Sequence, residues 1–396
     1  MTAAYPAEKD HPAVPMGAVY AGHPPLSRIA FPSGHEGWLV TRYDDVRTVL
    51  ADPRFSRNLL YPGAPCLIEP GDFATGERSI LNLDPPDHTR LRRLSAQAFT
   101  VRRIAALRPR IQEIADDLVD TLVAHGPPAD LVEEFAFPLP TAVMCELLGV
   151  PFAARERFRR WSRVIVTPMQ HAPADVERAR RDGAHDMAEL VAAKRAAPAG
   201  DFLSALVHAR DEDGDRLTEA ELIDLATQLL LAGHETTVSL ISTGIFLLCR
   251  YPEQLAALRA DPALTSGAVE EIMRYDSPAE VSLLRVALED VELAGCVVGR
   301  GDAVLAHTGA ANRDENVFPD AAAFDIRRKN APQLGFGHGI HFCLGAALAR
   351  LEGEIAVRTL VDRLPGLDLA VSPESVVWRP PLSVCGPEEV PVTWVA

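Results

Sequence analysis

Residues 334–350 read LGFGHGIHFCLGAALAR, and this stretch is the most informative in the chain. One cysteine, Cys343, lies among four glycines: Gly335, Gly337, Gly339 and Gly345. Apolar residues then recur at helical spacing: Leu344, Leu348, Leu351 and Ile355. This spacing predicts that a helix begins directly after the cysteine. The stretch therefore presents one sulfur atom at the start of a helix, on a backbone that can approach another molecule closely.

The position of Cys343 favours the negatively charged form of its sulfur. The thiolate is the form that binds metals, and a free thiol has a pKa of about 8.5. The unpaired N–H groups and the dipole of a helix N-terminus both stabilise a thiolate. The glycines let the backbone lie against a large flat molecule, Phe336 can pack against it, and His341 can donate to an anion at its edge. A haem fits this pattern, because its iron needs a soft axial ligand and its propionates need donors.

Three other interpretations of this stretch remain open. The cysteine could be a buried residue in a glycine-rich turn. A zinc site could use His338, His341 and Cys343, but the sequence offers no fourth ligand nearby and no second cysteine pair. A Cys/His nucleophile would leave the glycines without a role. The haem interpretation accounts for the most features.

The segment FGHGIHFCLG, residues 336–345, resembles the haem-binding signature of the cytochrome P450 family, Phe-x-x-Gly-x-His-x-Cys-x-Gly. Every fixed position matches: Phe336, Gly339, His341, Cys343 and Gly345. Further motifs similar to those of the family occur in the family's order, from about residue 37 to the C-terminus. The resemblance implies a mainly α fold with small β-sheets. It also implies that haem b lies between a long central helix and the cysteine loop, with Cys343 as its axial thiolate ligand.

We expect residues 1–396 to form a single domain of this kind. Helical patterns dominate from about Thr89 to Arg274, whereas residues 290–306 are typical of short strands. The sequence shows no internal repeat and no interdomain linker. The first 15 residues or so are rich in proline and alanine and are expected to be loose.

A second informative stretch is AGHETT, residues 232–237, in the middle of a long apolar helix predicted over 217–248. Thr218 and Glu221 form a capping box at the start of this helix. A glycine inside a helix costs about 1 kcal/mol relative to alanine, and Thr236 can bond back to the carbonyl of Ala232 and bend the helix. Such conflicts often mark function, although a kinked packing helix with a satisfied glutamate is the alternative.

AGHETT resembles the oxygen-activation motif of the cytochrome P450 family. The resemblance implies that the hydroxyl of Thr236 holds oxygen or water, and that Glu235 relays protons from solvent. His234 is expected to lie on a helix face rather than to bind metal, because the cysteine already serves as the ligand.

Donors for the propionates are suggested by DPPDHTRLRR, residues 84–93. His88 and Arg92 are four residues apart and therefore lie on one helix face, where two donors suit a carboxylate. The resemblance assigns both to the haem propionates and adds Arg285. The alternative for each is a solvated surface charge.

The segment EEIMRY, residues 270–275, resembles the Glu-x-x-Arg pair that braces the core of the family through Glu271 and Arg274. The sequence departs from similar members at Ala323, where an arginine that completes the network is usual. Arg327 or Arg328 is the expected replacement, or the network is smaller.

Composition excludes several classes of function. The formal net charge of −16 argues against nucleic-acid binding, and the N-terminus shows no secretory signal. Six scattered cysteines argue against a disulfide framework and fit a reducing cytoplasm. The most apolar region, 222–248, is expected to be a buried helix and not a membrane span, because polar residues interrupt it: Asp224, Gln228, His234 and Glu235.

One basic segment stands out in this acidic chain. Between His88 and Gln112 there are seven arginines and no acid. Such a segment is usually a solvated helix face. The family receives electrons from another protein, so we expect Arg102 and Arg103 to help dock an acidic ferredoxin, which is in turn reduced by an NAD(P)H-dependent reductase.

The sequence thus predicts a bacterial-type haem-thiolate monooxygenase that inserts one atom of O2 into an apolar substrate by hydroxylation or epoxidation. The resemblance to actinobacterial enzymes suggests a polyketide or macrolide substrate and a monomeric protein. The pocket is expected to use residues 57–83, the helix break at 165–180, and four apolar residues: Leu229, Ala232, Val281 and Leu284. Alternatives are a terpenoid or steroid substrate, a coupling or peroxide-using enzyme, and a non-catalytic sensor.

Overall fold

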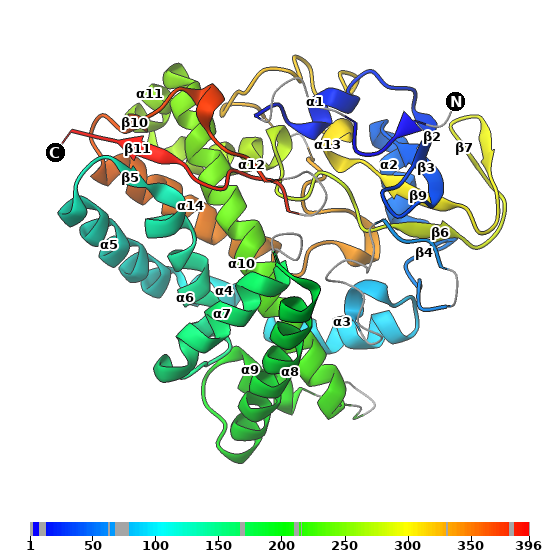
Figure 1. Cartoon of the computed structure of the whole chain (residues 1–396), viewed down its shortest axis with the longest axis horizontal. Coiled ribbons are helices and arrows are strands. Elements are labelled where there is room, and N and C mark those ends of the chain that lie inside the picture. The colour runs from blue at the N-terminus through cyan, green and yellow to red at the C-terminus, as the bar shows by residue number, and fades with distance from the viewer. Residues whose placement is uncertain are drawn as a thin grey trace.

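The computed structural model describes residues 3–7, 13–61, 64–67, 79–166, 171–209, 214, 216–329, 332–379 and 384–395. A helical part and a smaller β-sheet part lie side by side, with the long helix α10 crossing the middle (Figure 1). This arrangement confirms the mainly α fold with small sheets. Residues 167–170, in the expected helix break, and residues 62, 63 and 68–78, in the expected loop, lie outside the description.

The helices follow the periodic segments of the sequence. Their bounds are α1 Met16–Tyr20, α2 Tyr43–Ala51, α3 Asp87–Ala98, α4 Val101–Ala106, α5 Arg108–His125, α6 Pro138–Leu147, α7 Arg155–Val166, α8 Pro173–Ala196, α9 Phe202–His208, α10 Glu219–Arg250, α11 Pro252–Ala260, α12 Thr265–Tyr275, α13 Thr308–Ala311 and α14 Ala346–Arg363. Short 3-10 turns include η1 Ile80–Asn82 and η6 Gly339–His341.

The strands are short and form three sheets. Their bounds are β1 Ala3–Ala4, β2 Leu26–Ala30, β3 Glu36–Val40, β4 Phe55–Ser56, β5 Ala129–Asp130, β6 Arg285–Ala287, β7 Val291–Leu293, β8 Cys296–Val298, β9 Ala303–Ala306, β10 Asp368–Leu369 and β11 Pro391–Thr393. The largest sheet has the order β1-β2-β3-β9-β6-β4. The strands expected in 290–306 are therefore confirmed as β7, β8 and β9.

Two of the described N-terminal residues, Ala3 and Ala4, pair with this sheet. Strand β1 pairs in parallel with Ile29 and Ala30 of β2. Tyr5 follows it, is only 3% exposed, and stacks on Tyr20 of α1 with 5.8 Å between ring centroids. The packing of this aromatic side chain offsets part of the entropic cost of ordering the residues next to it. Amino-acid composition does not indicate such a contact.

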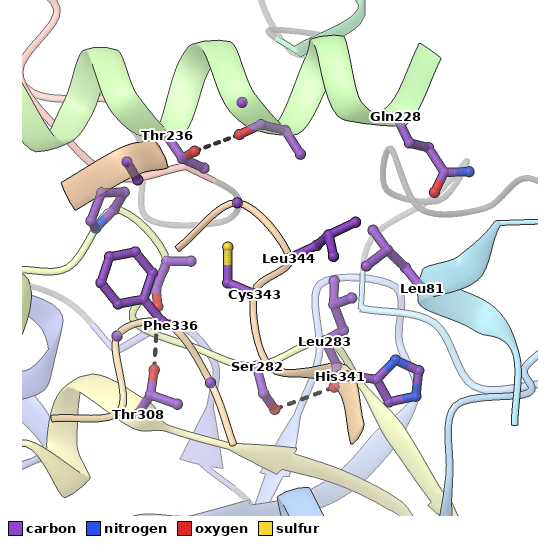
Figure 2. Close-up of a pocket in the computed structure, with 18 of the residues that line it drawn as sticks. Leu81, Gln228, Thr236, Ser282, Leu283, Thr308, Phe336, His341, Cys343 and Leu344 are labelled. Atoms are coloured by element: carbon purple, nitrogen blue, oxygen red, sulfur yellow. Dashed lines mark hydrogen bonds between the residues drawn. The ribbon is translucent and has the colours of Figure 1, made fainter. Parts of the chain in front are cut away.

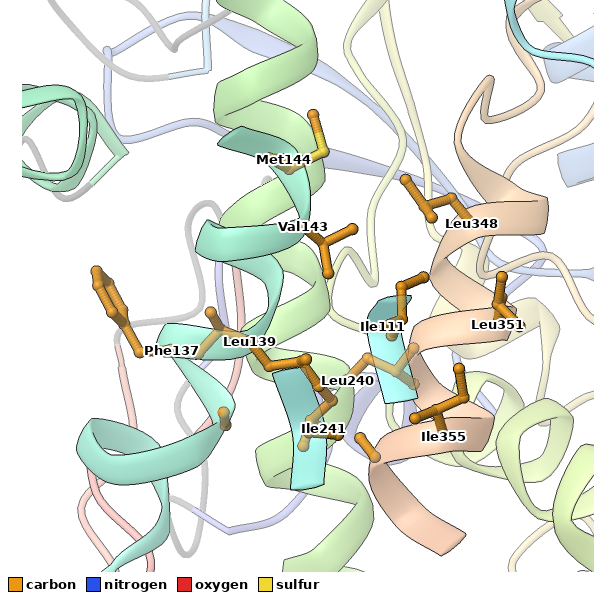
Figure 3. Packing of buried hydrophobic residues seen from close by; sticks show 14 of the residues in the cluster. Ile111, Phe137, Leu139, Val143, Met144, Leu240, Ile241, Leu348, Leu351 and Ile355 are labelled. Carbon is orange, nitrogen blue, oxygen red and sulfur yellow. The ribbon is translucent and has the colours of Figure 1, made fainter. Parts of the chain in front are cut away.

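Helix α10 organises the core. The predicted capping box is present: the Thr218 hydroxyl accepts from the backbone of Glu221, and the Glu221 carboxylate accepts from the backbone of Thr218. The helix is long and apolar enough to cross a membrane, but 78% of its most apolar window is buried inside the protein, which confirms the expectation of a core helix. Figure 3 shows its residues Leu240 and Ile241 packed between α6 and α14.

Two elements bring distant basic residues together. Strand β4 pairs with β6 in antiparallel register, with Ser56 opposite Val286, so Arg57 and Arg285 become neighbours. Helix α3 carries His88 and Arg92 on one face, as their spacing predicts. The sheet and α3 thus supply one polar wall of the site described next.

Candidate active site

A cavity of about 350 Å³ lies between α10 and the cysteine loop, within the size range of small-molecule sites. Cys343 lines it, and Figure 2 shows its sulfur pointing into the space across from Thr236 of α10. Burial raises the pKa of Cys343, while the backbone N–H of Gly345 and the charges of Arg92 and Arg350 act in the opposite direction. Cys343 has exposed surface, and the residue lines the cavity.

The glycines around Cys343 have different roles, and this corrects part of the expectation. A Cβ on Gly339 would lie 2.4 Å from the carbonyl oxygen of Leu50, and the φ of this glycine is +73°. Gly339 is therefore required for packing on α2 and not for contact with a flat ligand. Gly345 lines the cavity and has nothing within 4 Å of its Cβ position. Of these two glycines, only Gly345 leaves room on the cavity side.

Several buried donors face the cavity without a partner. In the described part of the chain, no hydrogen bond reaches Nε2 of His88, Nε2 of His341 or Nε of Arg285. The rings of His88 and His341 are 4.3 Å apart between centroids. Burial, and then the charge of Arg57, lowers the pKa of Arg285 to about 10. Since buried polar groups are nearly always paired, these donors fit acidic groups of a ligand.

Arg57 is a member of this cluster that the sequence analysis missed. It is 2% exposed, and its guanidinium donates to the carbonyls of Leu81 and Leu284 and to the side chain of Asn82. Arg92 also lines the cavity and donates to the carbonyl of Phe342 at 2.6 Å. No local pattern around Arg57 indicated this position, because β4–β6 pairing creates it.

Helix α10 forms the opposite wall. The Thr236 hydroxyl donates to the carbonyl of Ala232 at 2.5 Å, as predicted, and Thr237 donates to Gly233 at 2.8 Å. Both threonines line the cavity. The oxygen of each keeps lone pairs that can accept a further hydrogen bond, so this wall can hold water.

Glu235 does not line the cavity. It is 3% exposed and pairs with Arg379 at 2.6 Å, on the side of α10 away from the cysteine. His234 is buried rather than on a solvated face, and its ring packs edge-on against Phe137 with 4.5 Å between centroids. Arg379 lies 144 residues from Glu235, which explains why sequence spacing gave no indication of the pair.

A second carboxylate, Glu352 on α14, does line the cavity. It is 1% exposed, and within the described residues neither carboxylate oxygen has a hydrogen-bond partner. Burial raises its pKa to about 8. The sequence did carry a signal, because Glu352 continues the apolar i, i+4 series of Leu344 and Leu348 and is therefore an acid on an inward face.

The zinc interpretation of the cysteine loop finds no support. Over the described ranges, no group of three or more His, Cys, Asp or Glu side chains could hold a metal ion. The Cys343 sulfur and the unpaired donors instead fit a haem, a flat macrocycle that carries an iron ion and two carboxylates. The residues predicted to hold a haem are therefore brought together in one cavity.

Comparison with known proteins decides the family. The family profile of cytochrome P450 matches residues 156–365. The cytochrome P450 monooxygenase PikC of Streptomyces venezuelae is 49% identical over 371 residues, which cover 93% of this chain and 88% of PikC. The mycinamicin IV hydroxylase/epoxidase of Micromonospora griseorubida is 45% identical over 372 residues, covering 93% of this chain and 92% of that enzyme. This chain belongs to the cytochrome P450 family.

Solved structures agree with this assignment. The crystal structure of the mixed-function P450 MycG matches with a TM-score of 0.92 and 43% identity, and the match covers all of both chains. The LnmA cytochrome P450 hydroxylase of Streptomyces atroolivaceus matches with a TM-score of 0.91 and 43% identity, over 99% of this chain and 100% of that one. The protein is thus a P450 monooxygenase, an oxidoreductase, and haem-thiolate iron is the cofactor of its family.

The Glu-x-x-Arg pair of this P450 is buried and extended by a third residue. Arg274 donates to both oxygens of Glu271 at 2.8 Å and to the carbonyls of three further residues: Asn312, Ala321 and Ala323. The Nε of Arg328 lies 3.2 Å from Glu271. Arg328 is therefore the third partner of this network, in place of the arginine that similar proteins have at the position of Ala323. It is one of the two replacements that the sequence predicted.

The four residues predicted to face the substrate, Leu229, Ala232, Val281 and Leu284, line the cavity. Leu67, Ile80 and Leu81 contribute from the 57–83 loop. Among the described residues of 165–180, none lines the cavity.

The basic segment is partly neutralised. Arg90 pairs with Glu221, Arg108 with Glu354, and Arg110 with Glu113 and Glu146. Arg102 and Arg103 on α4 are exposed, and neither forms an ion pair within the part of the chain that is described. Fewer arginines of this segment are available to a partner protein than the sequence suggested. Arg102 and Arg103 are among those that are available.

Proposed function

We propose that this P450 uses Cys343 as the thiolate ligand of haem b and oxidises a macrolide or related polyketide. The observation that carries the proposal is that Cys343, Thr236 and the residues with unpaired buried donors all line one cavity. The relatives include a mycinamicin IV hydroxylase/epoxidase and a 6-deoxyerythronolide B hydroxylase, which are macrolide-tailoring enzymes.

Each residue has a role that follows from its contacts. His88, Arg92, Arg285 and His341 would hold the two propionates, which would give their buried donors partners. Phe336 would pack on the macrocycle, and Gly345 would let it lie close to the backbone. Cys343 would push electron density onto the iron and favour O–O cleavage. When bound, the haem supplies the activation of O2: one oxygen atom enters the substrate and the other leaves as water, with two electrons and two protons consumed.

The protons come from solvent and must be relayed to the cavity by side chains of the chain. Thr236 can accept a hydrogen bond from water while it donates to Ala232. Glu352 opens onto the same cavity, and its raised pKa lets it hold a proton near neutral pH and release it. Glu235 can take part only if its carboxylate turns away from Arg379. We therefore assign Thr236 to holding water and Glu352, alongside Glu235, to proton supply.

The electrons would come from an acidic ferredoxin and its NAD(P)H-dependent reductase, with docking at Arg102 and Arg103. Their exposure, and the lack of a carboxylate partner among the described residues, support this assignment. We further propose that the enzyme is a cytoplasmic monomer.

A terpenoid or steroid is the second candidate substrate. The cavity walls are largely apolar, and relatives at 43% identity include a vitamin D(3) 25-hydroxylase of Pseudonocardia autotrophica and a pentalenic acid synthase of Streptomyces avermitilis.

Turnover under isotopically labelled O2 tests the proposal. Macrolactones, steroids and sesquiterpenes are incubated with the enzyme, a ferredoxin, its reductase and NADPH. We expect one labelled oxygen atom in a macrolactone product and none when the ferredoxin is left out. Labelled steroid or terpene with unchanged macrolactone would reassign the substrate. Unlabelled product formed with peroxide alone would favour the peroxide-using alternative.

A further inference from the structure

The wall of the cavity formed by α10 and the segments facing it is largely apolar, and its hydroxyl groups are already engaged. Thr236 and Thr237 donate to carbonyls within α10, Ser282 donates to the carbonyl of Leu283, and Thr308 to that of Ala279. Figure 2 shows the contacts of Thr236, Ser282 and Thr308 as dashed lines. These hydroxyl protons are therefore not available to a substrate.

Gln228 is the exception on this wall. It lines the cavity from α10, and Figure 2 shows its side chain directed away from the helix towards the side on which Leu81 lies. Its Oε1 accepts from the Ser79 hydroxyl at 2.9 Å. Within the described chain its Nε2 has no partner, so both amide protons remain available.

Ser79 fixes which end of the Gln228 amide accepts a hydrogen bond. The Ser79 oxygen accepts from the backbone N–H of Leu81 at 3.2 Å, at the start of η1, and its single proton goes to Gln228. Ser79 is itself fully buried. Because the hydroxyl proton needs an acceptor, Oε1 is held on Ser79, and the amide N–H groups are left without a partner among the described residues.

The position of Gln228 sets a distance. It precedes Thr236 by eight residues on α10, and both line the cavity. At about 1.5 Å per residue the two positions are roughly 12 Å apart along the helix axis. We propose that Gln228 is a polar anchor that binds a neutral carbonyl oxygen of the substrate about 12 Å from the carbon to be oxidised. This inference rests on the proposed function, because it takes the oxidation to occur beside Thr236 and Cys343.

A set of two-headed ligands tests the anchor. Each probe carries an imidazole, which ligates the haem iron, joined by a methylene chain of varied length to a terminal methyl ketone. The matched probe has CH2 in place of the ketone carbonyl. Affinity is read from the shift of the haem absorption band, so no turnover is needed. We expect the ketone to bind roughly 3- to 10-fold tighter than its hydrocarbon partner, the gain of one neutral hydrogen bond, and only near one chain length.

Four variants locate the effect. Gln228→Leu should bring the affinity ratio to about one, and Gln228→Glu should bring it below one, because a carboxylate repels a carbonyl oxygen. Ser79→Ala should reduce the ratio without abolishing it, because the amide is then free to rotate. Thr227→Val is the control: Thr227 donates to Ile223 within the same helix and does not line the cavity, so the ratio should stay at the wild-type value.

A ratio of one at every chain length in the wild-type enzyme, or an unchanged ratio in Gln228→Leu, would overturn the anchor while leaving the proposed function intact. A protein whose absorption does not respond to any imidazole would overturn the proposed function and the anchor together.

Discussion

At the scale of single residues, the candidate active site is marked by buried polar atoms that have no partner among the described residues. Among the residues that the structure describes, His88, His341 and Arg285 each leave a ring or guanidinium nitrogen unpaired, and Glu352 leaves both carboxylate oxygens unpaired. Leaving one such group unsatisfied costs about 1–3 kcal/mol. All four residues line one cavity. The free-energy cost is therefore consistent with groups that become paired when a ligand binds or when a proton is transferred.

Thr236→Ala should loosen the coupling between electron use and product formation, because water would no longer be held beside Ala232. We expect more peroxide and less product for each NADPH consumed, with substrate binding little changed. Thr227→Ala is the matched control, since Thr227 makes the same type of bond to Ile223 but lies outside the cavity. Full coupling in Thr236→Ala would remove Thr236 from the mechanism.

Glu352→Gln should change the pH dependence of stability. Burial raises the pKa of Glu352 from 4.5 to about 8, so between these values the folded state binds more protons than the unfolded state. The stability of the wild-type protein therefore falls as pH rises through this window. The variant lacks this loss, and its Tm relative to wild type should increase from pH 5 to pH 8. A difference in Tm that does not vary with pH would contradict the assignment.

Helix α12 is tied to the segment that follows α13 by one buried ionic network. Glu271, Arg274 and Arg328 connect it to backbone carbonyls between Asn312 and Ala323. Removing one partner of a buried ion pair leaves the other uncompensated and typically costs about 3–5 kcal/mol. The network thus braces the chain that leads to the cysteine loop.

Arg328→Ala should lower the free energy of unfolding by roughly 1–3 kcal/mol, less than Arg274→Ala, because Glu271 keeps its main partner. Arg327→Ala is the neighbouring control: its side chain is exposed, and a surface change of this kind stays within about 0.5 kcal/mol. Urea unfolding followed by circular dichroism measures all three. Equal effects of Arg327→Ala and Arg328→Ala would show that Arg328 does not complete the network.

Helix α4 offers a test of partner docking. Reversing Arg102 and Arg103 to Glu should slow ferredoxin-driven turnover and weaken its dependence on salt. The control reverses Arg160 on α7 and Arg300 near β9, which are also exposed, so both double variants change the net charge of −16 by the same −4. An equal loss of rate in the two double variants would mean that only net charge matters.

The sequence predicted the local parts of this P450 well, because each depends on residues close together in the chain. The capping box of α10, the Thr236–Ala232 bond and the common face of His88 and Arg92 are of this kind. The partners that it missed come from distant elements: Arg379 with Glu235, and Arg57 beside Arg285. Spacing along one helix cannot show which strand or loop will cover it.

The whole molecule creates the site by joining two parts of different architecture. The sheet part carries Arg57 and Arg285, and the helical part carries Thr236 and Glu352. Strand β3 pairs with β9 in parallel, with Gly37 opposite Ala303, and this long-range pairing could not be predicted from hydrophobic periodicity. The cavity exists only where the two parts meet along α10.

The most direct test is the carbon monoxide difference spectrum of the reduced enzyme, recorded beside Cys343→Ala and Cys296→Ala. Cys296 is an exposed cysteine on β8, outside the cavity. We predict a thiolate-type band in the wild-type protein and in Cys296→Ala, and its loss in Cys343→Ala. A thiolate band that survives in Cys343→Ala, or no haem band in the wild-type protein, would contradict the account.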